Sequence, residues 1–271
     1  MRRTDGSNAY TARHFALAIL LGSVLVVSGP PVRADDLCGA TIVEDLKLHH
    51  DLTCPGAGLI VGADGITIDL NGYTIAGSGI DVGINVTGKT DVSIRGGTVR
   101  GFAAGVRVNT SSDLAIVHNE FVANGEGIDL QSGSVANTIK QNLFRDHTTR
   151  AVMLRGGSAD NDIHHNTFTG NRVGILVFGG VDNILKKNIV SESSLAGIRL
   201  NVIASGNLIK DNLVVSNLAG IEFLVTPTGS AIGNDLVRNT IELNDCGLKG
   251  PTAGNRLKKN SFEANGADTC S

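Results

Sequence analysis

The sequence has no tryptophan and only two tyrosines among its 271 residues, whereas glycine occurs 35 times. This composition, together with many asparagines, is unusual for an ordinary mixed domain of helices and strands. No C-x-x-C motif occurs, which weakens the support for a redox centre or a zinc site. The sequence also lacks a Ser-His-Asp order, a phosphate-binding glycine loop and a dinucleotide-binding motif. It therefore gives no support for a serine hydrolase or a nucleotide-binding enzyme.

Positive charge is scarce as well, because no run of lysine or arginine is longer than two residues. Residues 1–34 hold four of the 23 basic residues and one of the 26 acidic residues. Residues 35–271 therefore hold 19 basic and 25 acidic residues, which gives them a net charge of −6. Such a chain is not a globally basic nucleic-acid binder, and we expect no nucleic-acid partner.

The N-terminus has the pattern of a secretory signal peptide. Basic residues precede an apolar run at 15–27, and small residues lead to Ala34 and then to Asp35-Asp36. The run is shorter than the ~20 residues that a membrane-spanning helix needs. We predict a signal peptide over 1–34 and an exported domain over 35–271, either periplasmic or secreted, with no membrane span after cleavage. An uncleaved anchor is the alternative.

A repeat of the form N-x-[IL]-x-x-N-x-[FVI] runs through most of the exported domain. Each copy is followed by a glycine and an apolar residue, such as Gly174-Ile175, except that Ala151-Val152 occupies this place once. These pairs recur every 22 to 24 residues until a last interval of 27. Copies of the repeat are "NTIKQNLF" at 137–144, "NDIHHNTF" at 161–168, "NILKKNIV" at 183–190, "NLIKDNLV" at 207–214, "NDLVRNTI" at 234–241 and "NRLKKNSF" at 255–262.

Within each repeat, apolar and polar residues alternate in three short segments, which indicates strands and not helices. About 23 residues suffice for three strands and three turns but not for an independent core, so the repeats must stack. The sequence therefore predicts an all-β fold, a single-stranded right-handed parallel β-helix with three sheets. The L-x-x-L-x-L signature of leucine-rich repeats, which have a similar length, is absent.

The second asparagine of the repeat marks the turn between the first and second strands of each coil. We expect it to adopt the left-handed backbone of a tight turn and to hydrogen-bond the same asparagine in the next coil. This column consists of Asn142, Asn166, Asn188, Asn212, Asn239 and Asn260.

Four cysteines lie in the exported domain, and an even number fits disulfides in an oxidising compartment. Cys246 and Cys270 are 24 residues apart, which is one coil and places them on neighbouring coils. We predict the disulfides Cys246–Cys270 and Cys38–Cys54, one near each end of the β-helix, where a coil has a neighbour on only one side.

The two positions before the asparagine column are mostly basic, although the domain is acidic. Adjacent coils lie ~4.8 Å apart, so a row of cations here suits an extended polyanion. A lysine-lined surface that discourages sheet association explains the row equally well. Adjacent histidines make a poor chelate, so we expect exposed residues rather than a metal site at 164–165. The candidate ligand-binding residues are Lys140, His164, His165, Lys186, Lys187, Lys210, Arg238, Lys258 and Lys259.

The segment "CGATIVEDLKLHHDLTCPGAGLIVGADGITIDLNGYTIAGSG" at 38–79, followed by these repeats, resembles the pectate-lyase-like right-handed β-helix superfamily. Within it, the chain is similar to the group with short parallel β-helix repeats that includes NosD-like periplasmic copper-accessory proteins. The N-T-D, G-H-G and R-I-K motifs of polygalacturonases and the D-P-H-D motif of mannuronan epimerases are absent. A NosD-like role would imply more methionine than the single Met153 of the exported domain.

The resemblance implies that a ligand would lie over the outer face of the sheet formed by the Gly-apolar strands. Arg107, Asp129 and Arg155 are the candidate catalytic residues there, because proton abstraction next to a carboxylate needs a base and a cation. A salt-bridge ladder that keeps the face soluble is the alternative. Asp160 and Asp162, in a glycine-rich loop, are weaker candidate Ca²⁺ ligands, and an ordinary turn explains them too. No other cofactor is predicted.

Two functions therefore remain open from the sequence. The first is an exported β-helix that binds an acidic polysaccharide and acts on it as a lyase or epimerase. The second is a non-catalytic periplasmic or surface protein, either structural or an accessory factor of the NosD type. The sequence leaves the oligomeric state open.

Overall fold

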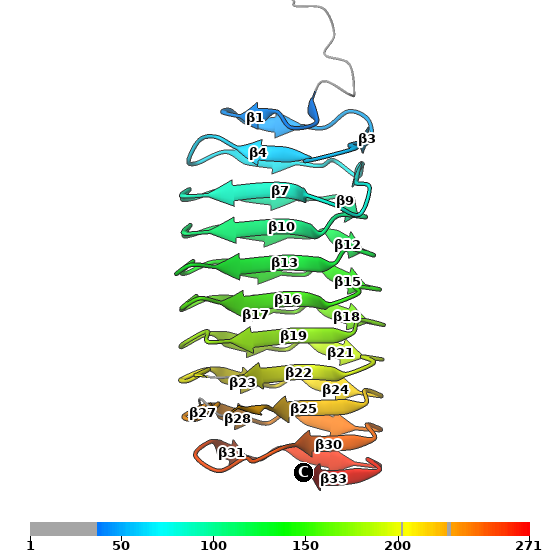
Figure 1. The fold of residues 1–271 in the computed structure, drawn as a ribbon, viewed down its shortest axis with the longest axis vertical. Helices are drawn as coiled ribbons and strands as arrows, with labels where there is room; N and C mark the ends of the chain where they lie inside the picture. Colours follow the sequence, from blue (N-terminus) through cyan, green and yellow to red (C-terminus); the bar gives the residue numbers. More distant parts are fainter. Residues whose placement is uncertain (1–36, 202, 227–228) are drawn as a thin grey trace, which may run out of the picture. The chain divides into compact units, whose positions relative to one another are not determined.

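The structure is a computed structural model that describes residues 37–271 apart from 202 and 227–228; the predicted signal peptide therefore lies outside the described residues. The described residues form strands and turns without an α-helix, and none of them belongs to a helix able to cross a membrane. Figure 1 shows the strands stacked coil on coil from blue to red. The predicted right-handed parallel β-helix is confirmed.

Three parallel sheets form the walls of the β-helix. Sheet A has eleven strands, and it contains the longest strands because its middle strands extend over six residues each. Its strands are β1 (Thr41–Ile42), β4 (Leu59–Val61), β7 (Val82–Thr87), β10 (Ala104–Asn109), β13 (Glu126–Gln131), β16 (Arg150–Arg155), β19 (Val173–Phe178), β22 (Ala196–Asn201), β25 (Ala219–Phe223), β30 (Cys246–Lys249) and β33 (Ala267–Cys270).

Sheet B follows sheet A along each coil and has ten short strands. They are β2 (Leu46–Lys47), β5 (Thr67–Asp69), β8 (Ser93–Arg95), β11 (Ala115–Val117), β14 (Thr138–Lys140), β17 (Asp162–His164), β20 (Ile184–Lys186), β23 (Leu208–Lys210), β28 (Asp235–Val237) and β31 (Arg256–Lys258).

Sheet C completes each coil and also has ten strands. They are β3 (Leu52–Thr53), β6 (Thr74–Ala76), β9 (Thr98–Arg100), β12 (Glu120–Val122), β15 (Leu143–Arg145), β18 (Thr167–Thr169), β21 (Ile189–Ser191), β24 (Leu213–Val215), β29 (Thr240–Glu242) and β32 (Ser261–Glu263). A small antiparallel hairpin, β26 (Val225–Thr226) with β27 (Gly229–Ser230), accounts for the longer 27-residue interval.

The core consists of the middle residue of most three-residue strands and two alternate residues of most sheet A strands. Equivalent residues pair in register, as in Ile139 with Ile163 and Ile163 with Leu185. In sheet C, Phe144 stacks on Phe121 at 5.0 Å and on Phe168 at 4.7 Å between ring centroids. Because each side chain lies on its own equivalent one coil away, the register of the whole solenoid is fixed by packing.

The predicted asparagine column is confirmed as a buried hydrogen-bonded ladder. Oδ1 of Asn166 accepts hydrogen bonds from the backbone N–H (2.9 Å) and Nδ2 (3.1 Å) of Asn142, and Nδ2 of Asn166 donates to the carbonyl of Ile139 (2.9 Å). Each asparagine thereby satisfies backbone groups that would otherwise be buried without a partner.

The expectation that these asparagines adopt the left-handed backbone is wrong. The left-handed residue is the one immediately before the asparagine, for example His165 (φ 55°) before Asn166 and Lys187 (φ 52°) before Asn188. The preceding residue makes the bend, so the asparagine side chain can turn inward and reach the neighbouring coils.

The structure contains two further ladders that the sequence reasoning did not assign. One precedes sheet B and runs through Asn137, Asn161, Asn183, Asn207, Asn234 and Asn255. The other lies between sheets C and A and has two hydrogen-bonded parts, Asn124–His147–Asn171 and Ser193–Asn217–Asn244–Asn265. Between these parts, Oγ of Ser193 is buried without a hydrogen-bond partner among the described residues.

Both predicted disulfides, Cys38–Cys54 and Cys246–Cys270, are present. The second joins β30 to β33, which are adjacent strands of sheet A. Each disulfide thus links coils near one end of the β-helix.

Candidate functional site

The outer face of sheet A carries a column of side chains in register, which includes the predicted residues Arg107 and Asp129. Arg107 pairs with Asp129, Asp129 with Met153, and Met153 with Leu176 along neighbouring strands. The column continues through Arg199, Glu222 and Lys249 on β22, β25 and β30. Adjacent members lie one coil apart because the strands are parallel and in register.

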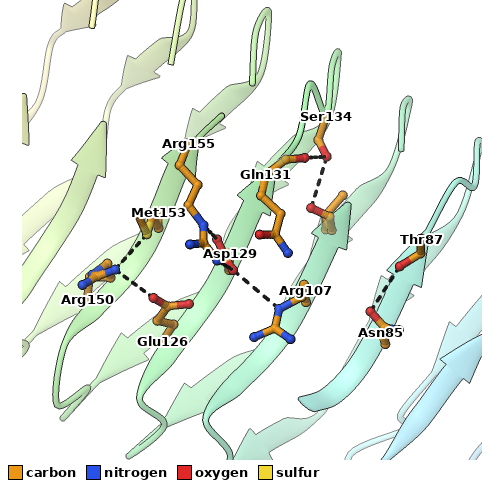
Figure 2. A network of polar contacts seen from close by, with 11 residues as sticks. Asn85, Thr87, Arg107, Glu126, Asp129, Gln131, Ser134, Arg150, Met153 and Arg155 are labelled. Atoms are coloured by element: carbon orange, nitrogen blue, oxygen red, sulfur yellow. Dashed lines mark hydrogen bonds and ion pairs between the residues drawn. The ribbon is translucent and has the colours of Figure 1, made fainter. Parts of the chain in front are cut away.

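Arg107, Asp129 and Arg155 meet at the centre of this face, as Figure 2 shows. Nε of Arg155 donates to Oδ1 of Asp129 (2.9 Å) and Nη2 of Arg155 donates to Oδ2 (2.6 Å), which is a bidentate ion pair. Nε of Arg107 lies 3.6 Å from Oδ2 of Asp129 and has no hydrogen-bond partner among the described residues. The structure thus assembles the three residues, while their catalytic role stays a prediction.

Asp129 is fully buried although it points to the outside of the sheet. The side chains of Arg107 and Arg155, with exposed fractions of 35% and 36%, lie over it. A buried carboxylate needs such cations to compensate for its lost hydration. The hydrogen bonds to Asp129 in turn raise the pKa of the Arg155 guanidinium, so this guanidinium stays charged.

A second ion pair, which sequence reasoning missed, lies beside the first. Nη1 of Arg150 donates to Oε1 of Glu126 at 2.9 Å and is also 2.9 Å from Sδ of Met153. Burial raises the pKa of the Glu126 carboxyl, and the nearby Asp129 carboxylate raises it further. Two carboxyl groups of one strand, β13, therefore lie among three arginines (Figure 2).

The middle of this face is apolar. Met153, Val173 and Leu176 form a small buried cluster with the partly buried Leu195 on the outside of sheet A. Phe178, beside Arg155 on the next strand, leaves 43% of its surface exposed. Beyond this apolar platform, Glu222 binds Arg199 (2.8 Å) and Lys249 (3.4 Å), so charged clusters lie on both sides of the platform.

The predicted row of cations lies on sheet B and at its corner with sheet C, but ion pairs interrupt it. Lys140, His164, Lys186 and Lys210 are in register on successive strands, and Val237 follows them. Lys186 binds Asp162 at 2.7 Å, and Arg238 binds Asp211 at 2.7 Å. No ion pair involves Lys140, Lys187, Lys258 or Lys259 within the described part of the chain.

His164 and His165 contact each other; His165 is exposed as expected, whereas the side chain of His164 is only 14% exposed. Their Nδ1 atoms are 2.8 Å apart, and Nε2 of His164 is 4.0 Å from Asp162. Burial lowers the pKa of the His164 imidazole. Across the described residues, no group of three or more histidine, cysteine, aspartate or glutamate side chains is arranged to hold a metal ion. Asp162, a predicted Ca²⁺ ligand with Asp160, instead accepts a hydrogen bond from Lys186.

Two family descriptions match the chain. "Right handed beta helix region" matches residues 36–168, and "Periplasmic copper-binding protein (NosD)" matches residues 148–269. No curated protein matches the chain. These matches and the fold place the chain in the right-handed parallel β-helix superfamily.

Several solved structures share this fold at low sequence identity. The periplasmic alginate epimerase AlgG superposes with a TM-score of 0.66 at 15% identity, over 81% of this chain and 73% of AlgG. The A-module of the Azotobacter vinelandii mannuronan C-5 epimerase AlgE6 gives 0.67 at 14% identity, over 82% and 69%. The alginate lyase from Paenibacillus sp. str. FPU-7 gives 0.56 at 14% identity, over 84% and 91%.

Proposed function

We propose that the protein is exported and binds an acidic polysaccharide across the outer face of sheet A. The observation that carries this proposal is the cluster of Arg107, Arg150 and Arg155 around Glu126 and Asp129, beside the apolar platform with the exposed Phe178. The five side chains bear a net charge of +1 when both carboxyls are ionised, although the exported domain as a whole is acidic.

The two parts of this face suit the two parts of a uronic acid. Arginine binds carboxylates through paired N–H donors, and the side chain of Arg107 is 35% exposed. The apolar platform with Phe178 offers a surface for the C–H face of a sugar ring. A polymer laid along the β-helix axis would meet the Arg107 cluster, the platform and then the Arg199–Lys249 cluster.

The structural neighbours support the choice of ligand. Their names describe an alginate epimerase, a mannuronan C-5 epimerase and an alginate lyase, and alginate is an anionic polysaccharide. Export is supported by the two disulfides and by the periplasmic proteins among the matches.

Removing the guanidinium of Arg107 is expected to weaken binding of a uronate oligosaccharide by about tenfold or more, because one charge-assisted hydrogen bond contributes ~1.5–3 kcal/mol. Titration calorimetry of Arg107→Ala at low salt measures this effect. Arg145→Ala is the matched control, since Arg145 is an ion-paired arginine on sheet C, 2.7 Å from Glu120. If Arg107→Ala and the unsubstituted protein bind with equal affinity, the outer face of sheet A is not the binding site.

The cations of sheet B provide a second, less specific contact with the same polymer in this proposal. Lys140→Glu with Lys187→Glu is expected to reduce affinity and the dependence of affinity on salt, without a change in melting temperature. These two lysines are preferable to Lys186, whose replacement by glutamate would face Asp162. If the double variant binds with the affinity and salt dependence of the parent protein, these lysines serve only solubility.

The second candidate function is a non-catalytic accessory protein of the NosD type. The match of residues 148–269 to that family favours it, as does the absence of polygalacturonase and epimerase motifs. Copper titration of the exported domain, followed by mass spectrometry under native conditions, would support this function if one ion were retained. The same protein would then show no affinity for uronate oligosaccharides.

A further inference from the structure

We propose that the outer face of sheet C is a docking surface for a second copy of this protein. The two copies are related by a two-fold axis that runs parallel to the strands, between β18 and β21, so the two β-helix axes are antiparallel. This arrangement places β9 of one copy opposite β32 of the other, and β15 opposite β24. The proposed polysaccharide site does not use this face, so the inference is independent of any ligand.

The middle of the outer face of sheet C carries no charged side chain, unlike the outer faces of sheets A and B. On β18, β21 and β24 the middle residue lies in the core, so the first and third residues lie outside. Ile189 is 44% exposed, and Leu143, in the same column on β15, is 36% exposed. Apolar side chains gathered on one exposed face are typical of an interaction surface. The outward residues of these three strands are Thr167, Thr169, Ile189, Ser191, Leu213 and Val215.

Two hydroxyl groups on this face already have partners within the chain. Oγ1 of Thr169 and Oγ of Ser191 are hydrogen-bonded to each other at 3.2 Å. Oγ of Ser191 also donates to the carbonyl of Phe168 at 3.3 Å. Covering a hydroxyl group is costly mainly when the group loses its hydrogen bonds. A partner can therefore cover Thr169 and Ser191 at small cost.

The charges at the two ends of the face favour a second copy as the partner. The exposed Arg100 lies at one end, on β9, and Glu242 and Glu263 lie at the other end, on β29 and β32. Glu242 and Glu263 are in register on adjacent strands, where like charges repel each other. Within the described part of the chain, no ion pair involves Arg100, Glu242 or Glu263. A face with one basic and one acidic end is complementary to the same face turned end over end.

The two-fold arrangement matches the two copies residue by residue. Because the axis is parallel to the strands, first residues face first residues and third residues face third residues. Arg100 of each copy therefore lies opposite Glu263 of the other copy, and Leu143 lies opposite Leu213. No two charges of the same sign on sheet C lie directly opposite each other. Each contact occurs twice, as the symmetry of an isologous interface requires.

The size of the face predicts a weak dimer. The eight strands from β9 to β32 are ~4.8 Å apart and about 10 Å long, so they cover an area of roughly 35 Å by 10 Å. This area is smaller than the ~800 Å² that each partner of a standard interface buries. We therefore expect a reversible dimer that forms at micromolar concentrations or above. Sheets A and B stay uncovered, so the dimer presents two copies of the proposed polysaccharide site.

Sedimentation equilibrium of the exported protein over a range of concentrations tests the dimer. Ile189→Lys is expected to weaken the association of the parent protein by about tenfold or more, because it places a charge near the two-fold axis in both copies. Ile203→Lys is the matched control, since Ile203 is 68% exposed in the loop between β22 and β23. Both variants should keep the melting temperature of the parent protein, because both side chains are exposed.

Exchange of the charges tests how the two copies are paired. Arg100→Glu alone and Glu263→Arg alone should each weaken the dimer by about tenfold or more at low salt, because each places like charges opposite one another. The double variant should restore the association, since opposite charges then face each other again. A double variant that associates no better than either single variant would contradict the proposed pairing.

Three other results would overturn the proposal. The first is a parent protein that stays monomeric at every concentration. The second is a dimer that Ile189→Lys leaves unchanged, because the copies would then meet through another face. The third is slower hydrogen exchange of β18, β21 and β24 only when a uronate oligosaccharide is added, which would assign the face to the carbohydrate. The first two results would leave the proposed polysaccharide binding by sheet A intact.

Discussion

Asn166→Leu is expected to lower the free energy of unfolding by roughly 2–6 kcal/mol, since each buried group left without its partner costs ~1–3 kcal/mol. The substitution removes the acceptor of the Asn142 backbone N–H and the donor to the carbonyl of Ile139. Both groups are buried between coils, where water does not replace the lost hydrogen bonds. The effect should be large because the ladder links consecutive coils from Asn119 to Asn260.

Urea denaturation of the exported domain, followed by circular dichroism, measures this loss. The control is His164→Ala with His165→Ala, which changes the two residues directly before Asn166. The double variant should lose less than about 1 kcal/mol, because the histidines contact mainly each other at the surface. A loss for the histidine variant as large as that for Asn166→Leu would contradict the central role of the ladder.

Acidification from pH 7 to pH 4 is expected to cost the fold about 3 kcal/mol through His147 alone. Burial lowers the pKa of its imidazole from 6.5 to about 4. Between these values the unfolded chain binds a proton that the folded chain does not, so the free energy of unfolding falls as the pH falls. Nδ1 of His147 accepts the backbone N–H of Asn124 at 3.2 Å, and protonation of Nδ1 removes that acceptor.

The variant His147→Asn isolates this effect because asparagine occupies the same ladder position in most other coils. We expect its stability at pH 7 to be close to that of the parent protein and its loss between pH 7 and pH 4 to be smaller by about 3 kcal/mol. Urea titrations at several pH values give the comparison. Parallel pH profiles for the two proteins would show that His147 is not the acid-sensitive group.

Recurrence explains which parts of the fold were predictable from sequence. The column of Asn166 and Asn188 can be recognised in the sequence because asparagine recurs at this position in every repeat. Stacking of the repeats then requires parallel strands. The third ladder is less regular, since His147 and Ser193 interrupt it, and it was missed. The backbone bend falls on residues as different as His165 and Lys187, so their left-handed conformation leaves no residue pattern.

The candidate site was predictable only where it follows the repeat. Asp129 and Arg107 occupy equivalent positions on neighbouring strands, so their contact follows from the register. Glu126 lies three residues earlier, where the adjacent strands carry Ala104 and Arg150, and its raised pKa depends on burial that sequence does not reveal. Likewise, Lys186 is neutralised by Asp162 from another position of the preceding strand.

A crystal structure of the exported domain with a uronate tetrasaccharide tests the central claim most directly. The proposal predicts a sugar carboxylate within hydrogen-bonding distance of Arg107 and sugar rings over Met153, Leu176 and Phe178 on sheet A. The same ligand bound only to the lysines of sheet B, or a sheet A face left bare at concentrations that saturate binding in solution, would contradict it.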